Sequence, residues 1–295
     1  MKNEIEFVNR RRGSRKLLYG AVSIFIAVWC FTLMYPLFWA FQQSLKTPFE
    51  YFTSGSVEWA EESQWQNYVR IFEELKVTVN RRKITFLEML WNTIWRTFGS
   101  VTLGIFATST VAYCLARYQF GARPIMWGVI VFMIVYPSMG TGGAAYKQAL
   151  DMGIHDSPLQ LIKVLGGYSG TAFFIIYSFY QTLPKDYSDA ATIDGASDFT
   201  IYLKIMLPMA MGPIMAMYAV QWISTWNDTT SVLLYYPSYP TLPAGLYVYQ
   251  NKAERAVDYP LFYTGVIITM IPTLTLFLVL QNKIMNNVTL GGLKG

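Results

Sequence analysis

The sequence predicts an all-α integral membrane protein with six transmembrane helices, and three observations lead to this class. The 295-residue chain is 53% hydrophobic. Only 14% of its residues are charged, against about 25% in ordinary globular domains. The charges are unevenly spaced, so that long charge-free runs reach or exceed the roughly 20 residues that cross a bilayer about 30 Å thick.

Charged positions delimit the predicted spans, because an ionised side chain at the bilayer centre costs roughly 3 kcal/mol on insertion scales. The runs taken as helices are 17–45, 97–116, 124–146, 164–184, 205–227 and 259–282. A further charge-free run, 229–251, contains Pro237, Pro240 and Pro243. Because these prolines interrupt a helix, we expect that run to be an external loop.

The basic N-terminus orients the spans. Residues 1–16 hold six basic and two acidic side chains, and a basic cluster directly before an apolar span is an orientation signal that places this tail in the cytoplasm. An even number of spans then makes both termini cytoplasmic, with one transmembrane domain over 17–285 and a C-terminal tail over 286–295. The connection 43–89 is expected outside, as a small folded cap or docking surface, although Arg81, Arg82 and Lys83 run against the positive-inside rule.

The fourth and fifth predicted spans are joined by a polar loop, 185–207, whose surroundings read DYSDAATIDGASDFTIYLKIMLP. A helix is expected from Asp189, where a carboxylate suits the positive end of the helix dipole, and Gly195 permits a turn. A second helix is expected from Ser197 or Asp198, both good N-caps. We expect this helix to carry Phe199, Tyr202 and Ile205 on one face, and Pro208 to begin the next apolar helix.

In this loop Asp189-Ala190-Ala191 is followed by Asp194-Gly195-Ala196, and then by Ile205 and Leu207-Pro208. The pattern resembles the cytoplasmic signature loop of ABC importer permeases, which usually reads Glu-Ala-Ala, three residues, Gly, nine residues, Ile, one residue and Leu-Pro. The spacing agrees throughout, and Asp189 replaces the usual glutamate. The Asp-Gly-Ala variant is most similar to carbohydrate importers such as the smaller maltose-transporter permease. An amphipathic loop lying on the membrane surface is the alternative.

The resemblance implies the type I ABC importer permease fold and a permease subunit for ATP-driven carbohydrate import in the bacterial cytoplasmic membrane. In this family the loop forms a coupling helix that docks into the ATP-hydrolysing subunit. The residues that the resemblance assigns to ATPase coupling are Asp189, Ala190, Ala191, Asp194, Gly195, Ala196, Ser197, Phe199, Leu207 and Pro208.

The same resemblance implies the partners. They are a second permease subunit in a heterodimer, two ATP-binding subunits that hold the ATP and Mg, an extracytoplasmic substrate-binding protein, membrane lipid, and a sugar or oligosaccharide. No cofactor and no nucleic acid are expected on this chain, which lacks a phosphate-binding Gly-x-x-x-x-Gly-Lys-Ser/Thr loop. Another neutral solute, such as a polyol or a glycerol phosphodiester, is the alternative cargo. The C-terminal residues 291–295 resemble a tail that reaches between ATPase subunits, with a frayed terminus as the alternative.

Polar residues in the fifth span form a candidate substrate path. Gln221, Ser224, Thr225 and Asp228 recur at helical spacing, so they share one helix face. Amides and hydroxyls near aromatic rings suit a neutral polyol, but Ser, Thr and Gln also hydrogen-bond between membrane helices, and both readings stay open. The candidate path residues are Tyr136, Gln221, Ser224, Thr225, Trp226, Asn227 and Asp228.

The charged residues argue against an ion-coupled carrier. Arg96, Lys147, Lys163 and Asp228 are expected near the outer ends of the spans, where long side chains reach the interface. An enzyme is not expected either. Catalysis would need an activated nucleophile, a carboxylate pair or a metal site, and Ser169 lacks the Gly-x-Ser-x-Gly spacing. Cys30 and Cys114 lie in apolar runs and predict no metal site.

Overall fold

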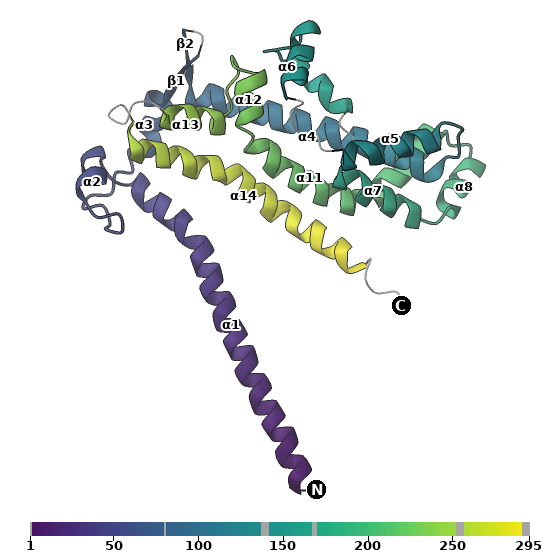
Figure 1. Cartoon of the computed structure of the whole chain (residues 1–295), viewed down its shortest axis with the longest axis horizontal. Coiled ribbons are helices and arrows are strands. Elements are labelled where there is room, and N and C mark those ends of the chain that lie inside the picture. Colours follow the sequence, from purple (N-terminus) through teal and green to yellow (C-terminus); the bar gives the residue numbers. More distant parts are fainter. Residues whose placement is uncertain (1, 80, 137–141, 167–169, 252–256, 291–295) are drawn as a thin grey trace. The chain divides into compact units, whose positions relative to one another are not determined.

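The computed structural model describes residues 2–79, 81–136, 142–166, 170–251 and 257–290. The described chain is helical apart from one short hairpin (Figure 1). It falls into two compact units. The first unit contains Met1–Ile71 and Arg255–Ile267, and the second contains Phe72–Glu254 and Ile268–Gly295. The candidate C-terminal tail, 291–295, lies outside the described residues.

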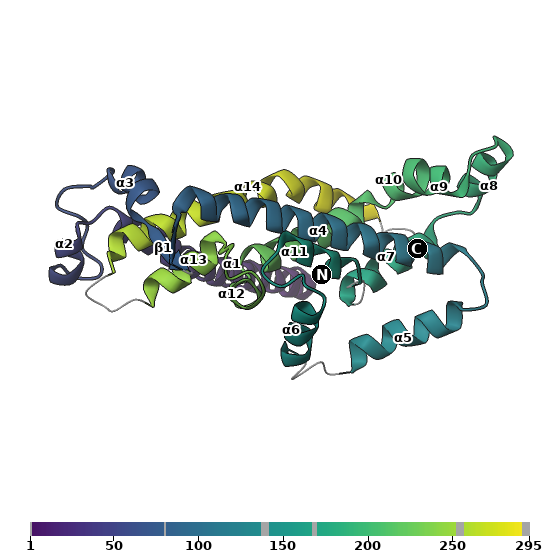
Figure 2. The same ribbon diagram turned by 90° about the horizontal axis from the view of Figure 1, so that it is seen from above.

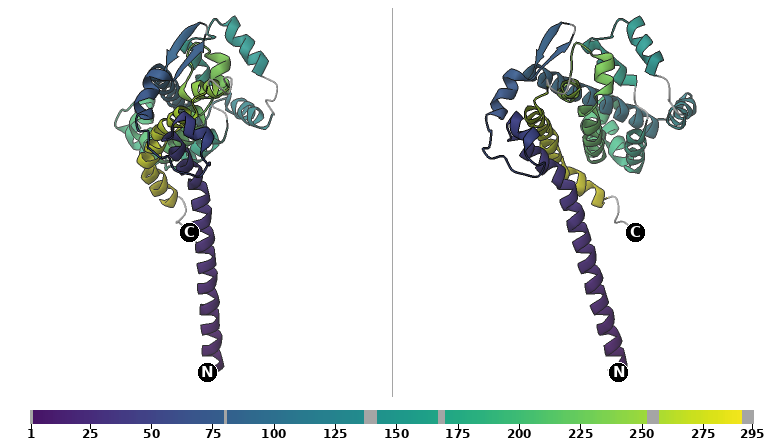
Figure 3. Two further views of the ribbon diagram at one scale, coloured as in Figure 1. Left: turned by 90° about the vertical axis from the view of Figure 1, so that its left-hand side faces the viewer. Right: turned by 60° about the vertical axis from the view of Figure 1, so that its left-hand side comes forward.

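In the first unit, α1 (Lys2–Ser44) is a single continuous helix that includes the basic N-terminal segment (Figure 3). The chain then turns through α2 (Pro48–Thr53) towards α3 (Asn67–Glu74). The amide of Asn67 donates to the carbonyls of Ser44 at 2.9 Å and of Lys46 at 3.1 Å. The buried ammonium of Lys46 donates to Ser54 Oγ at 2.9 Å. These bonds satisfy polar groups at the end of α1, so the first part of the 43–89 connection is folded.

A capping box starts α2. The hydroxyl of Thr47 accepts from the backbone N–H of Glu50 at 3.1 Å, and the carboxylate of Glu50 accepts from the N–H of Thr47 at 2.9 Å. Two N–H groups that the helix itself leaves unpaired are thereby satisfied. The second carboxylate oxygen of Glu50 accepts from the N–H of Glu61 at 2.8 Å, which fixes the following loop.

The second unit begins with the antiparallel strands β1 (Lys76–Val79) and β2 (Arg82–Thr85), which bury the facing pair Val77 and Ile84. Strand β2 leads directly into α4 (Phe86–Arg117), which Thr85 caps. The helix that contains the predicted second span therefore begins at Phe86 rather than at residue 97. The predicted boundary was wrong because Glu88 and Arg96 were treated as unpaired charges, whereas both are paired inside this unit.

The core of the second unit lies between α4, α7 (Thr171–Thr182) and α11 (Met211–Trp226), which run side by side (Figures 1 and 2). Tyrosine hydroxyls are satisfied within it, because Tyr180 pairs with Ser109 at 2.9 Å and Tyr202 with Thr110 at 3.0 Å. The 3₁₀ helix η1 (Pro158–Gly166) packs on α4 where a Cβ at Gly104 would lie 2.8 Å from Val164. Glycine permits this close approach of two helices.

The other elements of the second unit are short, and part of α14 (Tyr259–Leu290) also belongs to it. Two short helices with a break between them occupy 229–251, so the discontinuity predicted from the prolines is confirmed. In chain order the short elements are α5 (Arg123–Val135), α6 (Gly142–Asp151), α8 (Asp186–Ile193), α9 (Asp198–Ile201), the π-helix η2 (Tyr202–Met206), α10 (Leu207–Met209), α12 (Thr230–Tyr235) and α13 (Leu242–Gln250).

The described helices include three that are long and apolar enough to cross a membrane: Leu18–Ser44, Phe86–Arg117 and Tyr259–Gln281. Two bent pairs raise the number to five if each pair is one crossing, namely η1 with α7, and Asp198–Met209 with α11. Helix α5 has only 13 residues, so the predicted span 124–146 is not one continuous helix among the described residues. The chain is a multi-pass membrane protein, and the sixth crossing and the sidedness of the termini stay predictions.

Candidate functional site

The predicted signature loop forms a helical hairpin made of α8, α9, η2 and α10. Asp186 and Asp189 lie in the first turn of α8, where their charges favour the helix dipole. Ala190 and Ala191 are strong helix formers, and Ala191 is the buried residue of α8. Asp194 ends the helix, with its N–H bonded to the carbonyl of Ala190.

Gly195 closes α8 with a Schellman motif. Its φ is +80°, a left-handed conformation that favours glycine. The N–H of Gly195 donates to the carbonyl of Thr192 at 3.0 Å, and the N–H of Ala196 donates to that of Ala191 at 3.0 Å. These are the two bonds that define the motif. Ala191 is part of the core and Ala196 packs against that core, so the alanines flanking the turn hold it on the protein.

The second half of the hairpin begins at Ser197, as predicted, and its hydroxyl accepts from the N–H of Thr200 at 3.4 Å. The prediction that Phe199 and Tyr202 share one face with Ile205 is wrong, because Phe199 is 67% exposed and Tyr202 only 4%. The wider π-helical turn from Tyr202 onwards changes the helical register. Leu207 and Pro208 lie in α10, and the chain then bends by 75° before α11.

The hairpin is held on the helical core by a ring contact and a hydrogen bond. The ring of Tyr202 stacks on that of Tyr113 at 4.8 Å. Arg117, at the end of α4, donates to the carbonyl of Pro184 just before α8, at 3.2 Å. Burial raises the pKa of the Tyr118 phenol, and the neighbouring Tyr113 and Asp198 raise it further. The hairpin also carries three large apolar side chains that are exposed: Tyr187, Ile193 and Phe199.

The polar stripe predicted in the fifth span lines a pocket of about 530 Å³ at the C-terminal end of α11. Five candidate path residues contribute to it, together with three residues that continue into α12. The full lining is Gln221, Ser224, Thr225, Asn227, Asp228, Thr229, Thr230 and Ser231. The sequence signal for the last three residues was the unbroken polar run 227–231. The predicted span ended at 227, so only part of this run was assigned to the path.

The buried side chain of Arg96 joins α4 to this pocket. Its Nη2 donates to Asp228 Oδ2 at 2.7 Å, and its Nη1 donates to the carbonyl of Thr225 at 3.1 Å. The guanidinium also lies 5.4 Å from the ring centroid of Tyr236. The other oxygen of Asp228 accepts from the N–H of Ser231 at 3.0 Å, at the start of α12. The expectation that Arg96 extends to the interface is wrong, because Arg96 is 6% exposed and neutralises Asp228.

The stripe therefore divides into two groups. Thr225 and Asp228 hold α11 to α4 through Arg96. Gln221 and Ser224 are exposed to the pocket, and the hydroxyl of Ser224 makes no hydrogen bond within the part of the chain that the structure describes. Gln221 Nε2 donates to Thr225 Oγ1 at 3.4 Å, while its Oε1 makes no hydrogen bond among the described residues. A free hydroxyl and a free amide oxygen in a pocket of this size can bind a hydroxyl-rich molecule.

The remaining candidate path residues lie elsewhere. Trp226 is 1% exposed, and its indole N–H donates to the carbonyl of Thr269 in α14 at 3.1 Å. The ring of Trp222 stacks on that of Trp226 at 5.7 Å, so the two indoles pack with the core rather than line the pocket. Tyr136 follows α5, is exposed, and stacks on Phe132.

The chain is similar in sequence to curated transport proteins. It is 22% identical over 286 residues to the diacetylchitobiose uptake system permease protein of Streptomyces coelicolor, covering 96% of this chain and 91% of the relative. It is 27% identical over 234 residues to the arabinooligosaccharides transport system permease protein of Halalkalibacterium halodurans, covering 76% and 82%.

In structure, the chain is similar to a chain of a bacterial ABC transporter involved in the import of the acidic polysaccharide alginate. The TM-score is 0.73 at 18% identity, covering 90% of this chain and 96% of the other, so the folds agree. The model of one protein family, described as binding-protein-dependent transport system inner membrane component, matches residues 5–289. These findings confirm the resemblance that the signature loop indicated. The chain belongs to the family of binding-protein-dependent transport system inner membrane components, which are transport proteins and not enzymes.

Proposed function

We propose that this chain is a permease subunit of an ATP-driven carbohydrate importer in the bacterial cytoplasmic membrane, with six spans and both termini in the cytoplasm. The similar proteins support the cargo class, since they are named for diacetylchitobiose, arabinooligosaccharides and alginate. A second permease subunit, two ATP-binding subunits and an extracytoplasmic binding protein complete the importer. ATP and Mg are bound by the ATP-binding subunits.

The observation that carries this proposal is the set of exposed apolar side chains on the α8–α9 hairpin. Ile193 is 86% exposed and Phe199 is 67% exposed, although the backbone that carries them is closed by a Schellman motif and an N-cap. Burying such a side chain at an interface stabilises the complex by about 1.5–3 kcal/mol. A rigid element that presents apolar groups to water suits docking to a partner, and the ATPase subunit is the partner that the signature loop implies.

The pocket at the end of α11 supports a neutral cargo. Its lining is almost entirely hydroxyl and amide groups, and the charge of its carboxylate, Asp228, is balanced by Arg96. A sugar presents many hydroxyl groups that donate and accept hydrogen bonds, so it matches such a surface better than an ion does. Gln221 and Ser224 are the side chains that we assign to cargo contact.

The test is uptake by the complete importer in proteoliposomes, with a panel of labelled oligosaccharides and glycerol. We expect uptake of an oligosaccharide that needs ATP and persists in the presence of a protonophore. Combining Gln221→Leu with Ser224→Ala should raise the cargo concentration for half-maximal uptake about tenfold, because each lost hydrogen bond contributes about 0.5–1.5 kcal/mol.

The matched control is Gln148→Leu, the same change at an exposed position on α6, which should leave uptake unchanged. Glycerol uptake without oligosaccharide uptake would contradict the carbohydrate assignment. Equal uptake by the pocket variant and the control would contradict the assignment of the pocket.

A further inference from the structure

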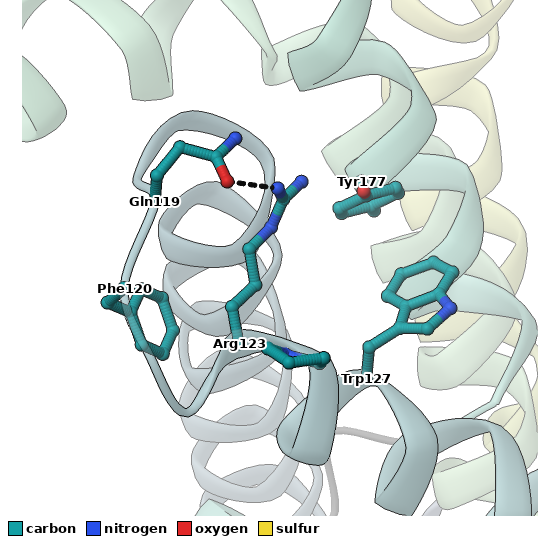
Figure 4. Close-up of a pocket in the computed structure, with 6 residues that line it drawn as sticks. Gln119, Phe120, Arg123, Trp127 and Tyr177 are labelled. Atoms are coloured by element: carbon teal, nitrogen blue, oxygen red, sulfur yellow. Dashed lines mark hydrogen bonds between the residues drawn. The ribbon is translucent and has the colours of Figure 1, made fainter.

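A second cavity, of about 310 Å³, lies where the turn between α4 and α5 meets α7 (Figure 4). It shares no residue with the polar pocket or with the exposed apolar residues of the hairpin. Its lining combines one cation with aromatic rings and an amide: Gln119, Phe120, Arg123, Pro124, Trp127 and Tyr177. None of these side chains is acidic.

The guanidinium of Arg123 is fixed in this cavity. Its Nε donates to the carbonyl of Leu115 at 3.0 Å, and its Nη1 donates to Gln119 Oε1 at 2.7 Å. Both acceptors are neutral, and within the described residues no carboxylate pairs with Arg123 and no partner binds its Nη2. Figure 4 shows the guanidinium held between Gln119 and Tyr177. The side chain thus keeps a full positive charge and a free donor.

A second donor lies on the facing helix. The hydroxyl oxygen of Tyr177 accepts from Gln181 Nε2 at 2.8 Å, so the proton of that hydroxyl remains available. The Tyr177 ring is 4.6 Å from that of Trp127, and this contact sets its direction. A fixed guanidinium and a phenol on opposite walls can both donate to the oxygens of one phosphate group.

Helix α5, whose first turns line the cavity, also carries exposed apolar side chains. Ile125, Val129, Phe132 and Met133 on this helix are all exposed. Tryptophan and tyrosine are typical of the level of the lipid headgroups, and Trp127 and Tyr177 line the cavity itself. A ligand with a phosphate at one end and hydrocarbon chains at the other could bind the donors of the cavity with its phosphate and pack its chains on the exposed apolar side chains of α5.

We propose that this cavity binds the phosphodiester headgroup of an anionic phospholipid, with the acyl chains along α5. The absence of an acidic lining residue disfavours phosphatidylcholine and phosphatidylethanolamine, because their ammonium groups would find no partner. Arg117 ties the end of α4 to Pro184, next to α8, so the cavity and the hairpin share one end of this unit. With the hairpin in the cytoplasm, as the proposed function has it, the lipid belongs to the inner leaflet. Binding of the headgroup itself does not depend on the proposed function.

The experiment titrates the purified full chain in neutral detergent with palmitoyl-oleoyl phosphatidylglycerol or with the matched phosphatidylcholine, and counts bound lipid by native mass spectrometry. Wild type should bind phosphatidylglycerol about tenfold more tightly than phosphatidylcholine, because the ammonium of phosphatidylcholine offsets the phosphate charge that Arg123 would contact. Arg123→Gln should reduce this preference to less than about twofold. Tyr177→Phe, which removes one hydroxyl and keeps the ring, should lower it about threefold.

Lys185→Gln is the matched control, since it removes one exposed positive charge near the same end and outside the cavity. It should keep the full preference. An unchanged preference in Arg123→Gln, or an equal loss in Lys185→Gln, would overturn the proposal. Inorganic phosphate in large excess is the competing probe. If it displaces phosphatidylglycerol from wild type, the cavity is a site for free phosphate and the lipid assignment is overturned. The assay needs neither ATPase nor cargo, so its result is independent of the transport test.

Discussion

Replacing Gly195 with alanine tests whether the shape of the α8–α9 turn determines coupling. The φ of Gly195 is +80°, and an added Cβ would meet nothing within 4 Å. The cost of the substitution is therefore conformational, about 1–2 kcal/mol for an L-residue in the left-handed region. If the turn opened instead, it would lose the bonds from Gly195 to Thr192 and from Ala196 to Ala191, at about 0.5–1.5 kcal/mol each. Both routes give a similar loss of free energy for the closed turn.

A destabilisation of this size lowers the population of the docking conformation about 5–30-fold. We expect Gly195→Ala to weaken binding of the ATPase subunits to the nanodisc-embedded permease by that factor, and to reduce ATP-dependent uptake accordingly. Gly195→Asn should recover part of the binding, because asparagine enters the left-handed region more readily than alanine does.

Gly153→Ala is the matched control for Gly195→Ala. Gly153 has a φ of +66° and open space around its Cβ position, but it lies after α6 and outside the hairpin. Its backbone cost should be similar, while ATPase binding stays at the wild-type level. The reasoning is refuted if Gly195→Ala binds ATPase normally, or if Gly153→Ala impairs binding to the same degree.

Two further predictions concern stability. Arg96→Met should lower the free energy of unfolding by about 3 kcal/mol. This is near the lower end for breaking a buried ion pair, because Asp228 is 27% exposed and can hydrate. Adding Asp228→Asn should recover more than half of the lost stability, and additive losses in thermal unfolding would contradict the pairing. Glu50 has a pKa below its ordinary 4.5, chiefly because its carboxylate accepts from the N–H of Thr47. The stabilisation that Glu50 provides is therefore complete above pH 4.5, and it is lost as the pH falls through the lower pKa of the folded state. Glu50→Gln should make the stability of the first unit, measured by hydrogen exchange, depend less on pH in the acid range. The same pH dependence in the variant and the wild type would count against this prediction.

The sequence predicted the hairpin well because its structure is encoded locally. Ser197 caps the helix that follows it, and Gly195 supplies the conformation that a Schellman motif needs. Each of these preferences belongs to a residue and its close neighbours. The family pattern then added the expectation of a coupling role, which no single residue of the loop expresses.

Predictions that depended on distant partners failed. Charge counting placed the start of the second span after Arg96, because an unpaired arginine is costly in a bilayer. The partner of Arg96 is Asp228, 132 residues further along the chain. Trp226 shares a helix with the polar stripe, but packing against Thr269 turns its indole away from the pocket. Helical spacing identifies a shared face, and tertiary packing decides which residues of that face remain accessible.

Helix α11 connects the two candidate sites. It begins at Met211 after the 75° bend that follows α10, and it ends at Trp226 beside the polar pocket. Its 16 residues give a length of about 24 Å at 1.5 Å per residue. Near its far end, Arg96 bonds Thr225 and Asp228 to α4. If the hairpin docks as proposed, its displacement would reach the pocket through α11, which is fixed to α4 near one end and follows a bend at the other. Because the hairpin makes no hydrogen bond to the pocket lining among the described residues, a fault in the hairpin should change the rate of uptake and leave the affinity for cargo unchanged.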